Sequence, residues 1–275
     1  MTKKNTTPKK RSDANALVPV TEASKALAMI GSVGAAPSKV RATTDTAVVR
    51  QAGVVMATGV TYHAKDHTIP NAQVFFVPDD RPDQDGPWLG EADKVAWCDM
   101  DTGYECIMLR EPSGGYLGGY VGVPETHPLY GFDHQAIPCD LGISVHGGLS
   151  YSNACDDGPS PERSYVVVEA RRICHPRDMR YLPTRHAGEY RVENPDAWWF
   201  GFACNHLYDR IPGDGGNRRG FMAAETEAEY RDDAYVIREI TILAAQLKAI
   251  SDGESAPARK GPRLPPIGLD LDEEF

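Results

Sequence analysis

Two histidines and one aspartate are the residues of this chain best suited by type and spacing to carry out chemistry. His146 precedes a pair of glycines, Gly147 and Gly148, and His206 lies three residues before Asp209 at the end of a long apolar run. A spacing of three puts an imidazole and a carboxylate on one face where the chain turns helically. We therefore expect His146, His206 and Asp209 to form one site.

This group of side chains fits three kinds of site. As metal ligands, the three residues would leave an open position, where a divalent ion lowers the pKa of a bound water to about 7 and supports hydrolysis. Without a metal, Asp209 would orient a histidine as a general base. The third interpretation is an ion pair at the end of a strand with no reaction. The spacing alone leaves all three open.

Other residues near these histidines are candidates for binding a ligand. Gly147 and Gly148 allow the backbone to turn tightly or to lie close to a bound molecule. Tyr151 and Trp199 offer aromatic faces to a base or a sugar, although aromatic residues in strands more often pack in the core.

An arginine-rich stretch is a second candidate binding region. Residues 163–191 contain seven arginines, in a chain whose formal net charge is −10. We expect Arg171, Arg172 and Arg177 to donate paired hydrogen bonds to phosphate oxygens. The alternative is a solvated loop that balances acidic neighbours elsewhere in the protein.

Regular elements must hold these residues in place, and the apolar pattern predicts a sheet. Segments of β-branched and aromatic residues bounded by glycine and proline are typical of strands. The expected strands are 54–62, 73–77, 104–110, 117–123, 142–145, 164–170 and 198–204, of which 104–110 and 117–123 should form a hairpin.

One amphipathic helix is expected towards the C-terminal end. Val236, Ile240, Leu243, Leu247 and Ile250 recur at spacings of four and three. This spacing is typical of a helix with one apolar side packed on a core. The predicted fold class is therefore α+β, with a mixed or antiparallel sheet covered by a C-terminal amphipathic helix and with disordered termini.

Composition divides the chain into three regions. Residues 1–47 begin with basic residues and are poor in large apolar groups, which predicts a flexible N-terminal tail with a short helix at 22–30. Residues 48–250 are expected to form a single globular domain. Residues 251–275 indicate a linker that ends in an acidic tip.

Composition also disfavours several classes of protein. Six cysteines without a C-x-x-C pair argue against a zinc ribbon and against a disulfide scaffold, and we expect most of them to be reduced. No stretch approaches the roughly 18 to 20 apolar residues of a membrane helix, and no secretory signal is recognisable. We therefore expect a cytoplasmic protein without a membrane partner.

Three segments of the chain resemble a family of uncharacterised phage and bacterial proteins. They are residues 119–124 (GYVGVP) with 127–131 (HPLYG), 145–151 (VHGGLSY), and 198–209 (WWFGFACNHLYD) with 230–232 (YRD). The resemblance covers roughly residues 104 to 250.

The third segment carries the match at the candidate site. In that family it usually reads Trp-Trp-x-Gly-Phe-Asp-Cys-x-His-x-x-Asp, and this chain keeps His206 and Asp209 but has Ala203 in place of the first aspartate. The resemblance implies a phage or prophage origin and one site shared by His146, His206 and Asp209. The missing carboxylate at Ala203 favours binding over catalysis in this chain.

The C-terminal tip has a resemblance of its own. Residues 269–275 (LDLDEEF) resemble the acidic, phenylalanine-terminated tips of single-stranded-DNA-binding proteins of bacteria and phages. In those proteins the tip docks on replication partners and competes with DNA for a basic groove. The resemblance implies that Asp270 to Phe275 contacts a host or replication protein, with the arginine-rich stretch as the candidate groove.

These observations lead to one function hypothesis and two alternatives. The leading hypothesis is a phage-type accessory protein that binds, and in one version hydrolyses, a phosphorylated small molecule or nucleotide in the pocket at His146, His206 and Asp209. The first alternative is a single-stranded-DNA-binding protein of phage replication or recombination, with arginines on phosphates and aromatic residues stacked on bases. The second is a structural or host-interaction protein without chemistry at the histidines.

Overall fold

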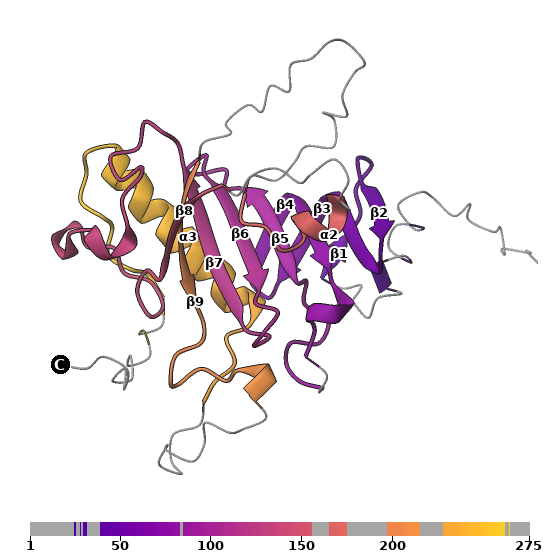
Figure 1. Cartoon of the computed structure of the whole chain (residues 1–275). Coiled ribbons are helices and arrows are strands. Elements are labelled where there is room, and N and C mark those ends of the chain that lie inside the picture. The colour runs from indigo at the N-terminus through magenta and orange to yellow at the C-terminus, as the bar shows by residue number, and fades with distance from the viewer. Residues whose placement is uncertain are drawn as a thin grey trace, which may run out of the picture.

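Nine strands form one sheet in the computed structural model of this protein (Figure 1). The structure describes residues 39–82, 85–155, 165–174, 197–214 and 228–261, together with residues 25, 28, 30, 31 and 264. Along the sheet the strand order is β1-β3-β4-β5-β6-β7-β9-β8, and β2 also pairs with β3. All neighbouring strands are antiparallel. The expected α+β class is therefore confirmed, in its antiparallel form.

The bounds of the elements follow from the backbone. The strands are β1 (Val40–Arg41), β2 (Ala47–Gln51), β3 (Val54–Ala64), β4 (His67–Phe76), β5 (Lys94–Cys98), β6 (Glu105–Arg110), β7 (Leu117–Val123), β8 (Tyr151–Ala154) and β9 (Trp198–Ala203). The helices are α2 (Tyr165–Glu169) and α3 (Asp233–Ser251), with short 3-10 turns η1 (Pro78–Asp80), η2 (His134–Ala136), η3 (Cys139–Leu141) and η5 (Pro212–Asp214). The predicted hairpin of 104–110 and 117–123 is confirmed by the pairing of β6 with β7.

Helix α3 covers one face of the sheet and lies across β6 and β7 (Figure 1). It begins after Asp232, whose carboxylate accepts a hydrogen bond from the backbone N–H of Tyr235 at 2.9 Å and so caps the first turn. On β7, a Cβ added to Gly119 would lie 2.6 Å from Cγ1 of Ile240, so the glycine is what lets helix and sheet approach closely. The predicted amphipathic helix is confirmed.

The opposite face of the sheet carries helix α2, which corrects the strand predicted at 164–170. Val166 and Ala170 are four residues apart and both are buried against β3 and β4, so one side of a helical turn suffices to bury them. The amine of Lys94 on β5 donates two hydrogen bonds, to the carbonyl oxygens of Glu169 and Arg172. A buried cation at the last carbonyls stabilises the end of a helix.

The segment predicted as a strand at 142–145 is also irregular in the structure. Gly142 has a φ of 74° and ends the turn η3, which stops an extended conformation at that point. The backbone N–H of Ser144 then donates to the side-chain oxygen of Gln246 on α3 at 3.0 Å. The side chain of Gln246 therefore accepts the hydrogen bond that a neighbouring strand would have accepted if 142–145 were a strand.

Ordered structure begins earlier than the predicted start at residue 48. Strand β1 pairs with β3 through Val40 and Tyr62, and Ile30 is fully buried in the main core. Of the helix predicted at 22–30, the described residues Lys25, Ala28 and Ile30 are helical. The acidic tip at 265–275 lies outside the described residues. None of the described helices has the length and apolar character to cross a membrane.

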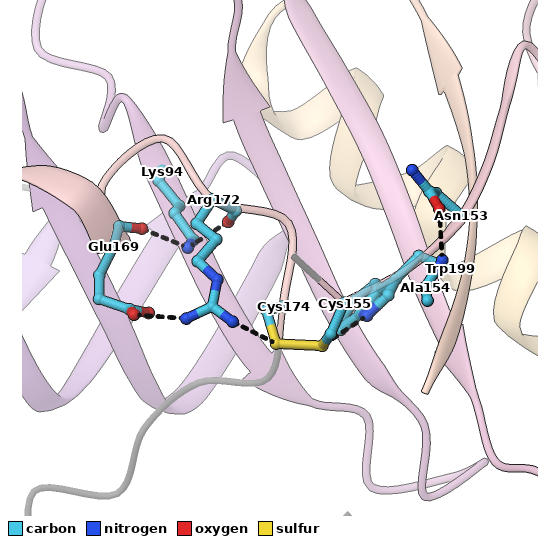
Figure 2. Close-up of a disulfide and its surroundings, with 8 residues drawn as sticks. All are labelled: Lys94, Asn153, Ala154, Cys155, Glu169, Arg172, Cys174 and Trp199. Atoms are coloured by element: carbon cyan, nitrogen blue, oxygen red, sulfur yellow. Dashed lines mark hydrogen bonds and ion pairs between the residues drawn. A yellow bond between two sulfur atoms is a disulfide. The ribbon is translucent and has the colours of Figure 1, made fainter. Parts of the chain in front are cut away.

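Most of the cysteines are free thiols, as expected, and one pair is oxidised. Cys155 and Cys174 form a disulfide, whereas Cys98, Cys106, Cys139 and Cys204 are free thiols. The bond joins the residue after β8 to the segment that follows α2, on the face of the sheet opposite α3 (Figure 2). The spacing of the cysteines in sequence could not reveal this pairing, since 19 residues separate the two.

A buried group of charges ties the sheet to the start of α3. The guanidinium of Arg110 donates to Glu91 and to Asp93, in each case at 2.9 Å, and all three residues are buried. The other carboxylate oxygen of Glu91 accepts the backbone N–H of Asp233, the first residue of α3, at 3.1 Å. The phenolic OH of Tyr62 on β3 donates to the Asp233 carboxylate at 2.6 Å. This Arg110–Glu91–Asp233 network links three elements that apolar packing alone would leave free to slide.

We expect substitution of Arg110 by Met to lower the free energy of unfolding by about 3 to 5 kcal/mol, because it leaves the buried carboxylate of Glu91 without its cation and leaves Asp93 paired with Arg81 alone. Urea unfolding followed by circular dichroism measures the change. The control is Lys248→Met, which removes the exposed ion pair with Asp252 and should leave the unfolding midpoint unchanged. Equal stability of the Arg110 variant and the wild type would contradict this role.

Candidate functional site

The pairing of β8 with β9 explains how the two histidine segments meet. The strands are antiparallel, with Tyr151 opposite Gly201, so the start of β8 and the end of β9 lie at the same end of the sheet. His146 precedes β8 and His206 follows β9. The expected proximity of two segments that are sixty residues apart in sequence therefore follows from the sheet register.

The side chains of His146, His206 and Asp209 converge on one carboxylate oxygen. Oδ2 of Asp209 lies 2.7 Å from Nε2 of His146 and 3.3 Å from Nδ1 of His206. The two imidazole rings are 5.1 Å apart, centre to centre, and meet edge to face. The structure thus brings together the three predicted residues, while the roles assigned to them stay predictions.

A tight turn after Cys204 sets the position of Asp209, as the spacing of three suggested. The backbone N–H of Asp209 donates to the carbonyl of His206 at 2.9 Å, and the backbone N–H of His206 donates back to Oδ2 of Asp209 at 3.0 Å. Beyond the turn, Arg210 and Tyr208 bond to the backbone of Glu229. This short pairing fixes where the chain must enter α3.

Two site residues were missed by the sequence analysis, and both come from the start of α3. Arg231 donates from Nε to Oδ1 of Asp209 at 2.9 Å, and the OH of Tyr235 lies 2.8 Å from Nδ1 of His146. The arginine side chain also lies over the Tyr235 ring. A signal was present, because Arg231 belongs to the YRD segment of the resemblance, but no spacing rule linked it to Asp209.

Asp209 is a buried carboxylate whose charge is fully matched by donors. Burial alone would raise its pKa, but the hydrogen bonds from His146, His206 and Arg231 outweigh burial and hold the pKa of Asp209 well below its usual value. The carboxylate therefore stays ionised over the whole physiological range. It can stabilise positive charge on a neighbouring imidazole without taking up a proton itself.

The two histidines differ in their access to solvent. The His146 side chain is 1% exposed and both of its ring nitrogens are engaged, by Tyr235 and by Asp209. The His206 side chain is 24% exposed, and within the described part of the chain its Nε2 has no hydrogen-bond partner. His206 is thus the more accessible of the two rings, with Nδ1 near Asp209 and Nε2 close to the backbone of Gly147.

Gly147 brings the backbone against the exposed histidine. Its φ is +67°, and a Cβ built on it would lie 1.8 Å from Cε1 of His206. Gly148 has a φ of +82° but faces open space, with nothing within 4 Å of a Cβ. The first glycine is therefore needed for a close approach to the imidazole, and the second only for the turn.

The donor types of His146, His206 and Asp209 suit a transition-metal ion, and their ligand atoms lie within 4.8 Å of one another. The hydrogen bonds argue for a different use. Nε2 of His146 already contacts Oδ2 of Asp209, and Arg231 places a positive charge on the other carboxylate oxygen. A metal ion would have to break the contact between His146 and Asp209, and it would lie near the positive charge of Arg231. The arrangement fits an Asp-oriented imidazole better than a metal centre.

The aromatic residues predicted as ligand contacts lie elsewhere. Trp199 is fully buried on the face away from α3, where its indole N–H donates to Cys155. Tyr151 packs edge to face on Tyr120 beside the same cluster. Alternation along β9 explains the outcome, because Phe200, on the other face, joins the core under α3.

The described arginines of the basic stretch are already paired. Arg171 forms an ion pair with Asp80, and Arg172 donates to Glu169 at 2.9 Å. Arg177 lies outside the described residues. The structure therefore separates Arg171 and Arg172 from the histidines.

Comparison of the chain with protein-family models, with curated proteins and with solved structures found no match. The arguments about function therefore rest on the contacts of this site alone.

We expect Gly147→Ala to displace His206 and to destabilise the protein by more than Gly148→Ala. Both substitutions place a side chain at positive φ, which costs about 1 to 2 kcal/mol, but only the first adds a collision with the imidazole. Urea unfolding gives the two stabilities, and the ring resonances of His206 in nitrogen-edited spectra report its position. Matching stabilities and unchanged His206 resonances in both variants would contradict this packing.

The depressed pKa of Asp209 predicts how stability depends on pH. A carboxylate with a lowered folded pKa stabilises the protein above its unfolded pKa of about 3.9, and this contribution is lost as the pH falls further. Wild type should exceed Asp209→Asn in unfolding free energy at neutral pH, and below about pH 4 the difference should shrink by up to about 1.4 kcal/mol per pH unit. Urea unfolding across this range tests it, and a difference independent of pH would show that the charge is not responsible.

Proposed function

We propose that this protein binds a phosphorylated small molecule, such as a nucleotide, at Nε2 of His206. The observation that carries the proposal is the asymmetry of the His206 ring, which is 24% exposed, with Nδ1 near buried Asp209 and Nε2 without a hydrogen-bond partner among the described residues. A ring held in this way has one nitrogen committed to orientation and the other available to a ligand. This is the division of roles expected of a histidine that exchanges protons with what it binds.

The charges around His206 favour an anionic ligand. The carboxylate of Asp209 is paired with Arg231, at 2.9 Å from its Oδ1, and Arg231 also pairs with the exposed carboxylate of Glu229. When the imidazole gains a proton, the open end of the site therefore becomes positive while Asp209 stabilises the imidazolium from behind. A phosphate oxygen is a strong acceptor for such a charged N–H donor.

The same geometry supports proton transfer to a bound phosphate ester. A protonated Nε2 can donate its proton to a leaving oxygen, and Asp209 keeps the ring oriented through the transfer. His146 is buried and contributes by holding Asp209 rather than by contacting a ligand. Hydrolysis therefore belongs to the proposal as a second stage, after binding.

The single-stranded-DNA alternative draws less support from the described residues. Its phosphate contacts were expected from Arg171 and Arg172, whose guanidinium groups are engaged by Asp80 and Glu169. Its stacking residue Trp199 is buried. The acidic tip at Asp270 to Phe275 and any partner it binds remain predictions of the sequence.

Calorimetric titration with inorganic phosphate and with nucleoside mono- and triphosphates tests the proposal. We expect at least one compound of the series to bind, because an imidazole N–H is a donor that a phosphate oxygen accepts. His206→Gln should weaken binding by about tenfold or more, the usual effect of losing one charged hydrogen bond. The matched control is His63→Gln on β3, at the other side of the sheet, which should bind as the wild type does.

Two results would contradict this proposal. One is the absence of binding by every phosphorylated compound in the series. The other is stoichiometric metal in the purified protein, measured by plasma mass spectrometry and lost in His206→Ala, since the site would then be a metal centre. Release of phosphate from a bound ester, absent in His206→Gln, would extend the proposal from binding to hydrolysis.

A further inference from the structure

The disulfide between Cys155 and Cys174 has surroundings that suit chemical exchange. Both cysteines are partly exposed, so a thiol from solvent can reach the bond. The indole N–H of Trp199 donates to Sγ of Cys155 at 3.3 Å, and Nη2 of Arg172 donates to Sγ of Cys174 at 3.5 Å (Figure 2). Each sulfur of the pair thus has its own N–H donor.

These donors favour the reduced form of the pair. A thiolate accepts hydrogen bonds and attracts a cation more strongly than a neutral disulfide sulfur does. The guanidinium of Arg172 beside Cys174 therefore makes Cys174 the better leaving group when the bond is attacked. Stabilisation of the reduced form is also what makes a disulfide easily reduced.

The disulfide also holds the end of the segment 165–174, which forms a cover over a buried amine. Lys94 on β5 is 1% exposed, and its Nζ donates to the carbonyl oxygens of Glu169 at 2.6 Å and Arg172 at 2.7 Å. Arg172 lies two residues before Cys174, so the disulfide holds one of these two carbonyls in place. Figure 2 shows the amine beneath the two residues and the disulfide at the end of the same segment.

We propose that Cys155 and Cys174 form a thiol–disulfide exchange site that accepts two electrons from a dithiol reductant, and that opening the bond uncovers the amine of Lys94. A reductant thiolate attacks Sγ of Cys155, which forms a mixed disulfide and releases Cys174 as a thiolate beside Arg172. The second thiol of the reductant then attacks the reductant's first sulfur, which is bonded to Cys155 in the mixed disulfide. Cys155 leaves as a thiol, and the reductant departs as a disulfide.

The remaining contacts of the cover show what reduction would release. At the start of the segment 165–174, the backbone N–H of Val166 donates to the side chain of Gln51 on β2, and Arg171 pairs with Asp80. Beyond Arg171, the segment is tied to the sheet by the disulfide, through the residue after β8, and by the hydrogen bond from Lys94 to the carbonyl of Arg172. Opening the disulfide therefore loosens the end of the segment that covers Lys94 rather than the start.

The reactivity of this amine depends on access to it. Burial lowers the pKa of Lys94 to about 8 while the amine is covered, and uncovering the amine removes the cause of this shift. Neutral lysine is the nucleophilic form. The amine is thus shielded by its cover, which makes its reactivity a direct readout of the cover.

Pulse labelling with an acetylating reagent, followed by peptide mass spectrometry, tests the proposal on the full chain. We expect the labelling rate of Lys94, relative to exposed Lys65, to rise by at least about tenfold when the protein is treated with dithiothreitol or reduced thioredoxin, since local opening then becomes frequent. Alkylation of cysteines in the same samples counts the opened disulfide. Resistance of the bond to both reductants in the folded protein would overturn the proposal, as would equal Lys94 labelling with the bond open and closed.

Two pairs of variants separate this effect from a general loss of structure. Cys155→Ser combined with Cys174→Ser should label rapidly at Lys94 without reductant, whereas Cys98→Ser combined with Cys139→Ser removes two exposed free thiols and should keep the wild-type response. Arg172→Gln should slow reduction several-fold compared with Arg171→Gln. A response that disappears in the Cys98 and Cys139 variant would contradict the assignment of the exchange site. Equal reduction rates in the two arginine variants would contradict the assignment of Cys174 as the leaving group.

Discussion

The buried guanidinium of Arg110 is the interaction on which the arrangement of sheet and helix depends. It neutralises Glu91 and Asp93 in a region closed to water, and Glu91 in turn receives the first backbone N–H of α3 at Asp233. Apolar packing is tolerant of small shifts, whereas a buried carboxylate separated from its cation costs several kcal/mol. The position of α3 along the sheet is therefore set by charge, and the apolar side of the helix then fills the space that this position defines.

The arrangement of the candidate functional site depends on the same few residues. Tyr230 and Asp233 face the Arg110–Glu91–Asp233 network, while Arg231 and Tyr235 face Asp209 and His146. One short segment at the entry to α3 thus serves both groups, so the site cannot shift without disturbing the buried charges. His206, on the partly exposed loop after β9, gains from this the rigid support that precise positioning requires.

The sequence predicted those parts of the molecule that depend on local pattern. The helix α3 and the hairpin of β6 with β7 follow from periodicity, and the meeting of His146 with Asp209 was foreseen although its cause, the register of β8 with β9, was not. The segment 164–170 was misassigned because Val-Val-Val is typical of a strand. The end of this helical turn is bound by Lys94, which lies 75 residues before Glu169 and 78 before Arg172 and donates to both carbonyls. Long-range partners of this kind, like the Cys155–Cys174 bond, leave no trace in local spacing.

Strand β8 connects the two unusual features of this protein. It is an edge strand of four residues that pairs only with β9 among the described strands, and so short an edge needs support at both ends. At one end the chain is held by His146 and its contact with Asp209, and at the other by the bond from Cys155 to Cys174. Trp199, which contacts Cys155, lies near the start of β9, and His206 follows the end of that strand. The short ladder of backbone hydrogen bonds between β8 and β9 is therefore what places the disulfide at one end of this strand pair and the histidine site at the other.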